Sequence, residues 1–512
     1  MRCWLIGLAL LVVPGAVQAE WLEASSPHFV VYADDSERDI RRFSEQLERY
    51  HDAMEVVTGR ELETPSPSNR VTVFVVKNVR EVQRLFGEGG RNVGGFYMPR
   101  AGGSLAIVPQ VKVGGSQLDW SMSTLLHEYA HHFLVSNSSF PMPRWLGEGA
   151  AEFFSAARFP SEGGLALGLP SRDNYLQIMY TDEVKVEELL DPDVYEKRRR
   201  QGYDSFYGKS WALYHYLTFE PERRGQLTSY LRLMASGKSS REAALEAFGA
   251  FADLDKDLEG YLRRPRVMTI VFQPDQLEAA PVAVRRLREA ETAMMPVRIR
   301  SKRGVSREQA LELLTDARAI AARYPADAAV QAALAEAEFD AGNDAEAIAA
   351  ADAALALDPA QVNAYVQKGY ALFRQAAEAE DTAAAYRRAI EPFLALNQRE
   401  NDHPLPLAFY FRSFAERGVR PPEQAVRGLE RAAALAPFDL GLRLNLASYQ
   451  IQSGALSDAR ANLVPVAYNP HGGPMADGAR QVIERIDAGG EPETSELMAL
   501  LRPPPAEAAS GG

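Results

Sequence analysis

The sequence predicts an α+β domain followed by an all-α array of repeated helix pairs. Strand-like and helical patterns alternate between residues 20 and 265, as expected when both element types pack into one mixed domain. In the second half alanine becomes the dominant residue type, and helical patterns recur with prolines at a near-constant interval. Pro359 follows Pro325 by 34 positions and Pro437 follows Pro404 by 33, while the interval from Pro359 to Pro404 is 45. This periodicity is typical of stacked two-helix units.

The composition is that of an ordinary globular protein. Of the 512 residues, 46% are hydrophobic and 24% are charged, which is enough apolar material to fill real cores and excludes general disorder. The net charge is -13, which argues against a nucleic-acid partner, because such a partner needs a basic surface. The single cysteine, Cys3, lies in the N-terminal segment described next, so a disulfide framework is excluded.

Residues 1–19 have the pattern of a secretory signal peptide. Arg2 provides the positive start, an apolar run extends from Trp4 to Val13, and small residues end at Ala19. The run is too short for a permanent anchor, and no later segment reaches about 18 uninterrupted apolar residues. We therefore expect an exported chain that starts at Glu20 and has no transmembrane segment after cleavage. The periplasm is the first expected location and full secretion the second.

Within the first half, each predicted element follows from its local pattern. Short apolar runs rich in β-branched and aromatic residues predict strands, and apolar residues at helical spacing predict helices. The strands are expected at residues 28–32, 71–76 and 104–108, and the helices at 35–57, 79–86 and 117–135. The last of these helices carries the residues from which a function can be inferred.

The helix at 117–135 contains an HExxH motif at residues 127–131. Two histidines four positions apart lie one turn above each other on one helix face, so the imidazoles of His127 and His131 can bind the same ion. Glu128 lies about 100° around the helix and can reach a water on that ion. The motif predicts one Zn²⁺ per chain, with Glu128 as the general base. Mn²⁺ and Co²⁺ stay open as alternatives, since these ligand types favour zinc without requiring it.

A catalytic zinc keeps three protein ligands and one open position, so a third ligand is needed. A metzincin would place glycine and histidine three and six positions after the second histidine, where this chain has Leu134 and Asn137. That type is therefore excluded. Downstream, Arg144 opens an apolar helical segment that contains two carboxylates four positions apart, Glu148 and Glu152.

With these residues the chain resembles the gluzincin metallopeptidases, in which a second helix after HExxH supplies a glutamate ligand, commonly in a Leu-x-Glu-Gly context. The matching residues here are Leu146, Glu148 and Gly149. The resemblance implies a thermolysin-like α+β fold, with Glu148 as the third zinc ligand and Glu152 orienting a ligand imidazole. Residues 20–265 resemble most closely the peptidase MA-like domain of bacterial exported proteins.

Two further segments extend the resemblance to the substrate cleft. The stretch from Phe206 to Leu217 resembles the Tyr-x-Lys-Gly-x-Ala-Leu segment of aminopeptidase N relatives, and Tyr207 matches the tyrosine that stabilises the tetrahedral intermediate. Ser210 replaces the glycine of that pattern. The resemblance also implies an edge strand over the cleft that binds the substrate backbone through Ser104, Leu105, Ala106 and Ile107. The Gly-x-Met-Glu-Asn exopeptidase signature is missing, so endopeptidase and exopeptidase action both stay open.

The second half resembles tetratricopeptide repeats. The small, apolar and proline positions of that motif are occupied by Leu334, Ala335, Gly342, Ala347, Ala354 and Pro359. We expect a connector at residues 266–305, in which a degenerate first repeat helix is an open alternative, then a repeat array at 306–490 and a flexible tail at 491–512. Such an array implies a protein partner.

The main hypothesis is an exported zinc metallopeptidase that hydrolyses a peptide or protein substrate, with the repeats recruiting the substrate or a partner protein. The alternative is a non-catalytic repeat scaffold or peptide-binding protein of the cell envelope, in which the metal domain is vestigial or structural. A chain that binds no metal would favour the alternative, because the main hypothesis requires an open zinc site.

Overall fold

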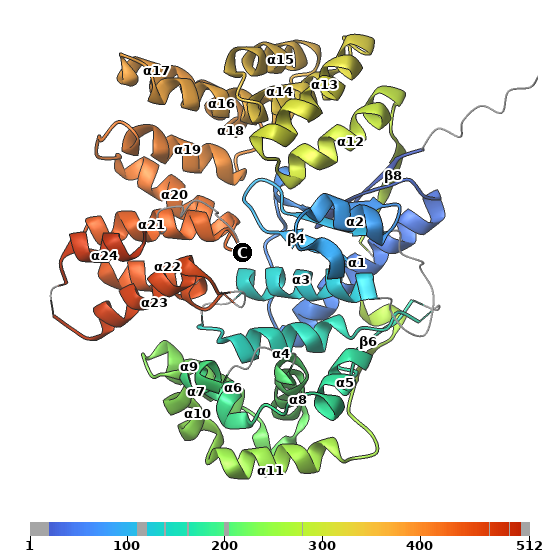
Figure 1. Ribbon diagram of the computed structural model, residues 1–512, viewed down its shortest axis with the longest axis vertical. Helices are drawn as coiled ribbons and strands as arrows, with labels where there is room; N and C mark the ends of the chain where they lie inside the picture. Colours follow the sequence, from blue (N-terminus) through green and yellow to red (C-terminus); the bar gives the residue numbers. More distant parts are fainter. Residues whose placement is uncertain are drawn as a thin grey trace, which may run out of the picture.

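The computed structural model describes residues 20–109, 120–137, 140–160, 163–198, 204–278, 280–469, 472–490 and 492–502 (Figure 1). The predicted signal peptide and residues 503–512 of the predicted tail lie outside the described residues. No helix within the described ranges is both long and apolar enough to span a membrane.

A six-stranded mixed sheet forms the centre of the first half. Its order is β4-β5-β3-β2-β1-β8, and β2, β3 and β5 run parallel to one another, while the other neighbouring pairs are antiparallel. The strands are β1 (Leu22–Ser25), β2 (Phe29–Ala33), β3 (Val71–Val76), β4 (Phe96–Met98), β5 (Leu105–Pro109) and β8 (Ala283–Arg286). All residues of β2 and β5 are buried, which explains their continuous apolar runs, since parallel strands covered on both faces need no polar alternation.

One face of the sheet is covered by α1 (Glu37–Thr58) and α3 (Trp120–Asn137). Leu47 of α1 and Leu126 and Phe133 of α3 are fully buried in the core that this face shares with both helices. The apolar stripe of α3 therefore faces the sheet, and the helix is anchored along its length.

The opposite face is covered by α2 (Val79–Phe86) and α12 (Glu289–Arg303). Val82, Met295 and Ile299 form a second buried core with β2, β3 and β5. Helix α12 also packs against the first repeat helices. The predicted connector at 266–305 is therefore part of the sheet layers, since it supplies both β8 and α12.

A helical layer lies below the sheet in Figure 1 and supports α3 from beneath. Its first helix, α4 (Arg144–Ser155), packs against α3 and α8. The layer continues with α5 (Arg172–Tyr180), α6 (Val186–Leu190), α7 (Pro192–Arg198), α8 (Phe206–Phe219), α9 (Gln226–Ala235), α10 (Ser240–Phe248) and α11 (Phe251–Leu262). The layer also contains a two-stranded sheet of β6 (Leu165–Leu167) and β7 (Ile270–Phe272), in which β6 contacts α4.

The second half consists of stacked antiparallel helices, as predicted. They form an arc down the left side of Figure 1. The helices are α13 (Arg307–Arg323), α14 (Ala328–Asp340), α15 (Asp344–Leu357), α16 (Val362–Ala377), α17 (Thr382–Ala389), α18 (Glu391–Asn397), α19 (Pro404–Ala415), α20 (Glu423–Leu435), α21 (Leu440–Gln452), α22 (Leu456–Ala467) and α23 (Pro474–Asp487).

Two features of the array were not apparent from the repeat pattern. The long interval between Pro359 and Pro404 accommodates two short helices, α17 and α18, after α16. Residues assigned to the flexible tail form a further helix, α24 (Thr494–Leu500), which buries Leu497 against α21 to α23. This part of the tail prediction is wrong, because the apolar residues of the segment complete the last core of the array.

Candidate metal centre

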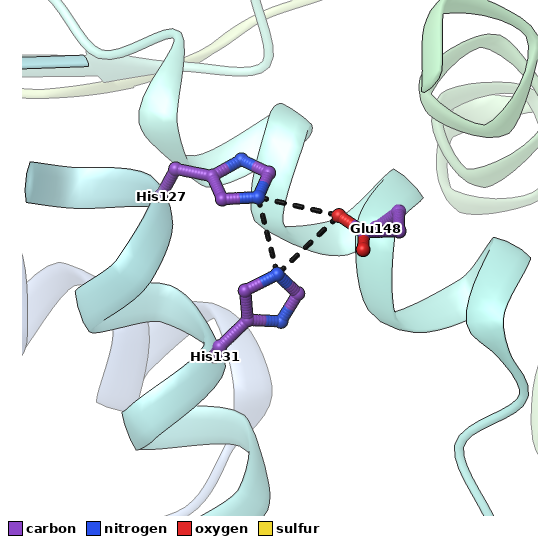
Figure 2. A group of neighbouring side chains, drawn as sticks. All are labelled: His127, His131 and Glu148. Atoms are coloured by element: carbon purple, nitrogen blue, oxygen red, sulfur yellow. Dashed lines mark hydrogen bonds and ion pairs between the residues drawn. The ribbon is translucent and has the colours of Figure 1, made fainter. Parts of the chain in front are cut away.

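Helices α3 and α4 bring the three predicted ligands together, as Figure 2 shows. His127 Nε2 lies 3.3 Å and His131 Nε2 lies 3.4 Å from Glu148 Oε2, and the two Nε2 atoms are 3.1 Å apart. Ligand atoms held about 2.0–2.1 Å from a tetrahedral zinc lie about 3.3 Å from one another. The three atoms therefore have the mutual spacing that a zinc ion requires.

The environment of Glu148 is that of a metal ligand. Its side chain is 1% exposed, and neither carboxylate oxygen has a conventional hydrogen-bond donor among the described residues. Burial raises the pKa of this carboxyl, but the contacts with His127 and His131 outweigh that effect and lower it below its ordinary value. A buried, ionised carboxylate without donors needs a cation, and the donor set of two imidazoles and one carboxylate fits Zn²⁺.

The backbone of α4 explains how Glu148 reaches this position. Gly149 lies against α8, where an added Cβ would be 2.4 Å from the carbonyl oxygen of Ser210. Only a glycine allows the two helices to approach this closely. Trp145 and Phe153 are buried on the same helix, so α4 is held firmly with Glu148 toward α3.

Glu152 lies one turn after Glu148 and contacts the other ring nitrogen of His127. Its Oε1 is 3.3 Å from His127 Nδ1, which leaves Nε2 directed at the centre of the site. Burial lowers the pKa of His127, but Glu148 and Glu152 outweigh burial and raise the pKa well above its ordinary value. The carboxylates therefore favour a positive charge at this position, whether it is a proton or a metal ion.

The remaining predicted residues of the reaction lie on two sides of this centre. Glu128 is partly buried on α3, and its charge contributes to the raised pKa of Tyr97, after the larger effect of burial. Tyr207, at the start of α8, lines a cleft of about 780 Å³ together with His127 and Glu152. Burial and then the charge of Glu148 raise the pKa of Tyr207, so its hydroxyl stays protonated and able to donate a hydrogen bond.

Arg144 lies beside Tyr207 and was not among the predicted site residues. Its guanidinium carbon lies 4.4 Å from the ring centroid of Phe206 and 5.9 Å from that of Tyr207. Burial and Glu148 raise the pKa of the Tyr207 hydroxyl, and Arg144 opposes this. The sequence indicates a role for Arg144 only through its position, four residues before Glu148 and therefore on the same helix face.

The predicted substrate-binding strand is wrong. Ser104, Leu105, Ala106 and Ile107 are all buried, and β5 is paired with β3 on one side and β4 on the other. An edge strand needs a free row of backbone groups, so β5 cannot add a substrate strand. Strand β4 is an edge strand of the sheet and lies on the side of α3.

Comparison with known proteins identifies a family model over part of the chain. The model is described as a protein of unknown function (DUF1570) and matches residues 121–239. This segment contains His127, His131, Glu148, Glu152 and Tyr207, and the description names no activity. No curated protein matches the chain.

The solved structures that are similar to the chain include a tetratricopeptide-repeat protein. A thermophilic tetratricopeptide-repeat protein of Thermus thermophilus is 18% identical with a TM-score of 0.29, and the match covers 35% of this chain and 90% of that one. A MamA chain beginning at residue 41, from Desulfovibrio magneticus RS-1, is 16% identical with a TM-score of 0.27, over 38% and 98% of the two chains. The helix pairs from α13 to α23 themselves define the second half as a repeat array.

Proposed function

We propose that this protein is an exported, periplasmic zinc-dependent metallopeptidase with its metal centre formed by His127, His131 and Glu148. The convergence of these three ligand atoms at tetrahedral spacing, beside a cleft that His127 lines, carries the proposal. Zn²⁺ bound there would lower the pKa of a water and polarise the scissile carbonyl. Three protein ligands leave the fourth position for that chemistry, as in hydrolytic zinc sites.

The residues around the centre have distinct roles in this proposal. Glu128 accepts the proton of the attacking water and passes it to the leaving amine. Tyr207 donates a hydrogen bond to the oxyanion that develops on the substrate carbonyl, and Arg144 keeps its hydroxyl oriented. Glu152 accepts from His127 Nδ1, which holds the imidazole in the tautomer that presents Nε2 to the ion.

The substrate in this proposal is a peptide in extended conformation. Among the described residues, β4 has a strand partner on one side only and lies against α3, so a substrate backbone can pair with its other side next to the metal helix. Backbone pairing gives affinity with little side-chain selection, and it suits cleavage within a chain as well as at an end.

The second candidate function is a protein-interaction scaffold. The observation that favours it is the array of helix pairs from α13 to α23, an architecture that commonly presents an extended binding surface. In this alternative the metal centre is structural or vestigial.

Metal analysis of the chain from Glu20, combined with a peptide-hydrolysis assay, discriminates the two functions. We expect one zinc per chain in the parent protein, none in Glu148→Ala, and retained zinc in Glu128→Gln with no peptide hydrolysis. Glu152→Ala should keep the site but bind zinc about 10–100-fold more weakly, since only the orientation of His127 is lost. A parent protein that stays free of metal after zinc is supplied would leave the scaffold as the function.

A further inference from the structure

The inner side of the repeat array contacts a specific part of the first half, the β4–β5 turn at residues 99–104. The backbone N–H of Ala101 donates to Asp439 Oδ2 at 2.8 Å, and the guanidinium of Arg100 donates to the carbonyl of Lys302. Gly102, with a φ of +76°, fits so closely that an added Cβ would be 2.8 Å from Leu405 Cδ1. In Figure 1 the array curves around this part of the molecule, with β4 on its inner side.

A second segment, just before β3, extends the contact. Ser68 donates to Glu400 from both its backbone nitrogen, at 2.9 Å, and its hydroxyl, at 2.8 Å. Asn69 connects this segment both to the array and to the turn. Its Nδ2 donates to the carbonyl of Leu435 at 2.8 Å, while its Oδ1 accepts from the backbone N–H of Gly102 at 3.1 Å.

The polarity of this contact is one-sided. At the turn and at Ser68–Asn69, the hydrogen bonds to the array all have their donors on the first half and their acceptors on the array. Asp439 is an example, since its Oδ1 caps α21 through Leu442 N at 3.0 Å while Oδ2 is directed at Ala101. The array thus presents a matched surface to the turn, and the carboxylates make the bonds charge-assisted.

A line of rings continues from this contact to the metal helix. The ring of Phe438, next to Asp439, lies 4.2 Å from the ring of His132, which follows the ligand His131 on α3. His132 Nδ1 is in turn 2.5 Å from the hydroxyl of Tyr97 on β4. One array residue thus touches the side chain that links the metal helix to the edge strand of the cleft.

We propose that the inner surface of the array is a binding surface for the chain's own β4–β5 turn, and that Phe438 and Asp439 hold β4 in position beside the metal helix. Phe438 acts through His132 and Tyr97 and is a positioning residue. The assignment of the surface stands on the contacts alone, whereas its effect on catalysis rests on the proposed peptidase function. A protein ligand for this surface would have to displace the turn and would release β4.

Asp439→Asn tests the surface with little change of shape. Asparagine caps a helix as well as aspartate does, but when its oxygen caps α21 its NH2 group, which is a donor, takes the place of the oxygen that accepts from Ala101 N. We expect amide exchange of residues 96–104 in the full-length protein to increase by about tenfold or more, as for loss of a charged hydrogen bond. Asp381→Asn is the matched control, because Asp381 caps α17 through Ala384 N and has no hydrogen bond to the turn among the described residues.

The glycines provide an independent test that does not depend on the cap. Gly102→Ala and Gly103→Ala both place a side chain at positive φ, but only at Gly102 does the new Cβ meet the array. Exchange of the turn should therefore rise more in Gly102→Ala than in Gly103→Ala. Equal effects of this pair, or unchanged exchange at 96–104 in Asp439→Asn, would overturn the proposal.

Phe438→Ala tests the positioning role. Exchange of β4 should rise while zinc content is unchanged, and the KM for a peptide substrate should rise more than kcat falls, because substrate pairing with β4 is weakened. Unchanged exchange at β4 would contradict the role of Phe438. If exchange rises but no peptide is cleaved by any variant or by the parent, the surface assignment stands and the peptidase proposal fails.

Discussion

Glu148 is buried and Asp340 is half-buried, and the surroundings of these two carboxylates shift their pKa values in opposite directions. Glu148 faces two imidazoles, which lower its pKa, so it is ionised and ready to hold a cation. Asp340, at the end of α14, is half-buried near Glu336, and its Oδ2 has no hydrogen-bond partner among the described residues. Burial, followed by the charge of Glu336, raises the pKa of Asp340 to about 6.

The raised pKa of Asp340 predicts a pH-dependent stability. In the unfolded chain its pKa is near the ordinary 3.8, so the folded state binds the proton more tightly. The stability that this proton contributes is present below pH 4 and is lost as pH rises through about 6. Asp340→Asn should therefore raise the free energy of unfolding at pH 7.5 by about 1–3 kcal/mol, and by almost nothing at pH 4. Urea unfolding at the two pH values measures the difference, and an equal effect at both would contradict the assignment.

At the scale of elements, the metal centre depends on how closely α4 packs against α8. Gly149 sits where these helices touch, and the neighbouring residue in sequence is Glu148. A displacement of α4 would carry Glu148 away from the two imidazoles on α3. The separation of the ligands is therefore set by helix packing as well as by the HExxH spacing.

Gly149→Ala tests this dependence. The new methyl group would meet the backbone of Ser210, which cannot move without shifting α8, so unfolding should be easier by about 1–3 kcal/mol and zinc binding weaker. Gly260→Ala, at an exposed position of α11, is the control, because nothing lies within 4 Å of a Cβ added there. That control should stabilise the protein by about 0.5–1 kcal/mol through helix propensity. Thermal unfolding and zinc titration of both variants measure these effects. A Gly149→Ala variant with unchanged stability and unchanged zinc affinity would refute the dependence of the site on the packing of α4 against α8.

At the scale of the whole molecule, the first half is completed by residues beyond the predicted domain boundary. Strand β8 pairs with β1 along four residues, from Leu22 opposite Arg286 to Ser25 opposite Ala283. Helix α12 covers one face of the sheet, and its Arg298 donates to the hydroxyl of Tyr32 at 3.0 Å.

A fragment that ends at residue 265 should consequently be poorly folded. It lacks β7 and β8 and exposes the sheet face that α12 covers, which leaves a long free edge and an apolar surface in water. A fragment of residues 20–304 retains these elements and should unfold cooperatively at a higher temperature. Circular dichroism melting and size-exclusion chromatography compare the two. A cooperative transition of the shorter fragment at the same temperature would show that residues 266–304 are dispensable.

The local elements and the core of the metal centre follow from sequence patterns. The apolar run at 71–76 predicted β3, and the helical spacing at 79–86 predicted α2, with the same bounds as in the structure. The two histidines of HExxH share a helix face because of the helical period, which is a local property. The assignment of Glu148 needed the resemblance to a family, since nothing in the spacing alone selects it over Glu152.

Other features of the site were decided only by tertiary structure. Strand order made β4 the edge and buried β5, although β5 has the stronger strand pattern. Arg144 beside Tyr207, and Phe438 against His132, join residues that are far apart in the chain. By itself, the sequence determined which residues can form the metal centre and where the helix pairs repeat, because both depend on short-range periodicity. Strand order, the contact between array and turn, and the side chains that surround the site depend on long-range packing, which no local period specifies.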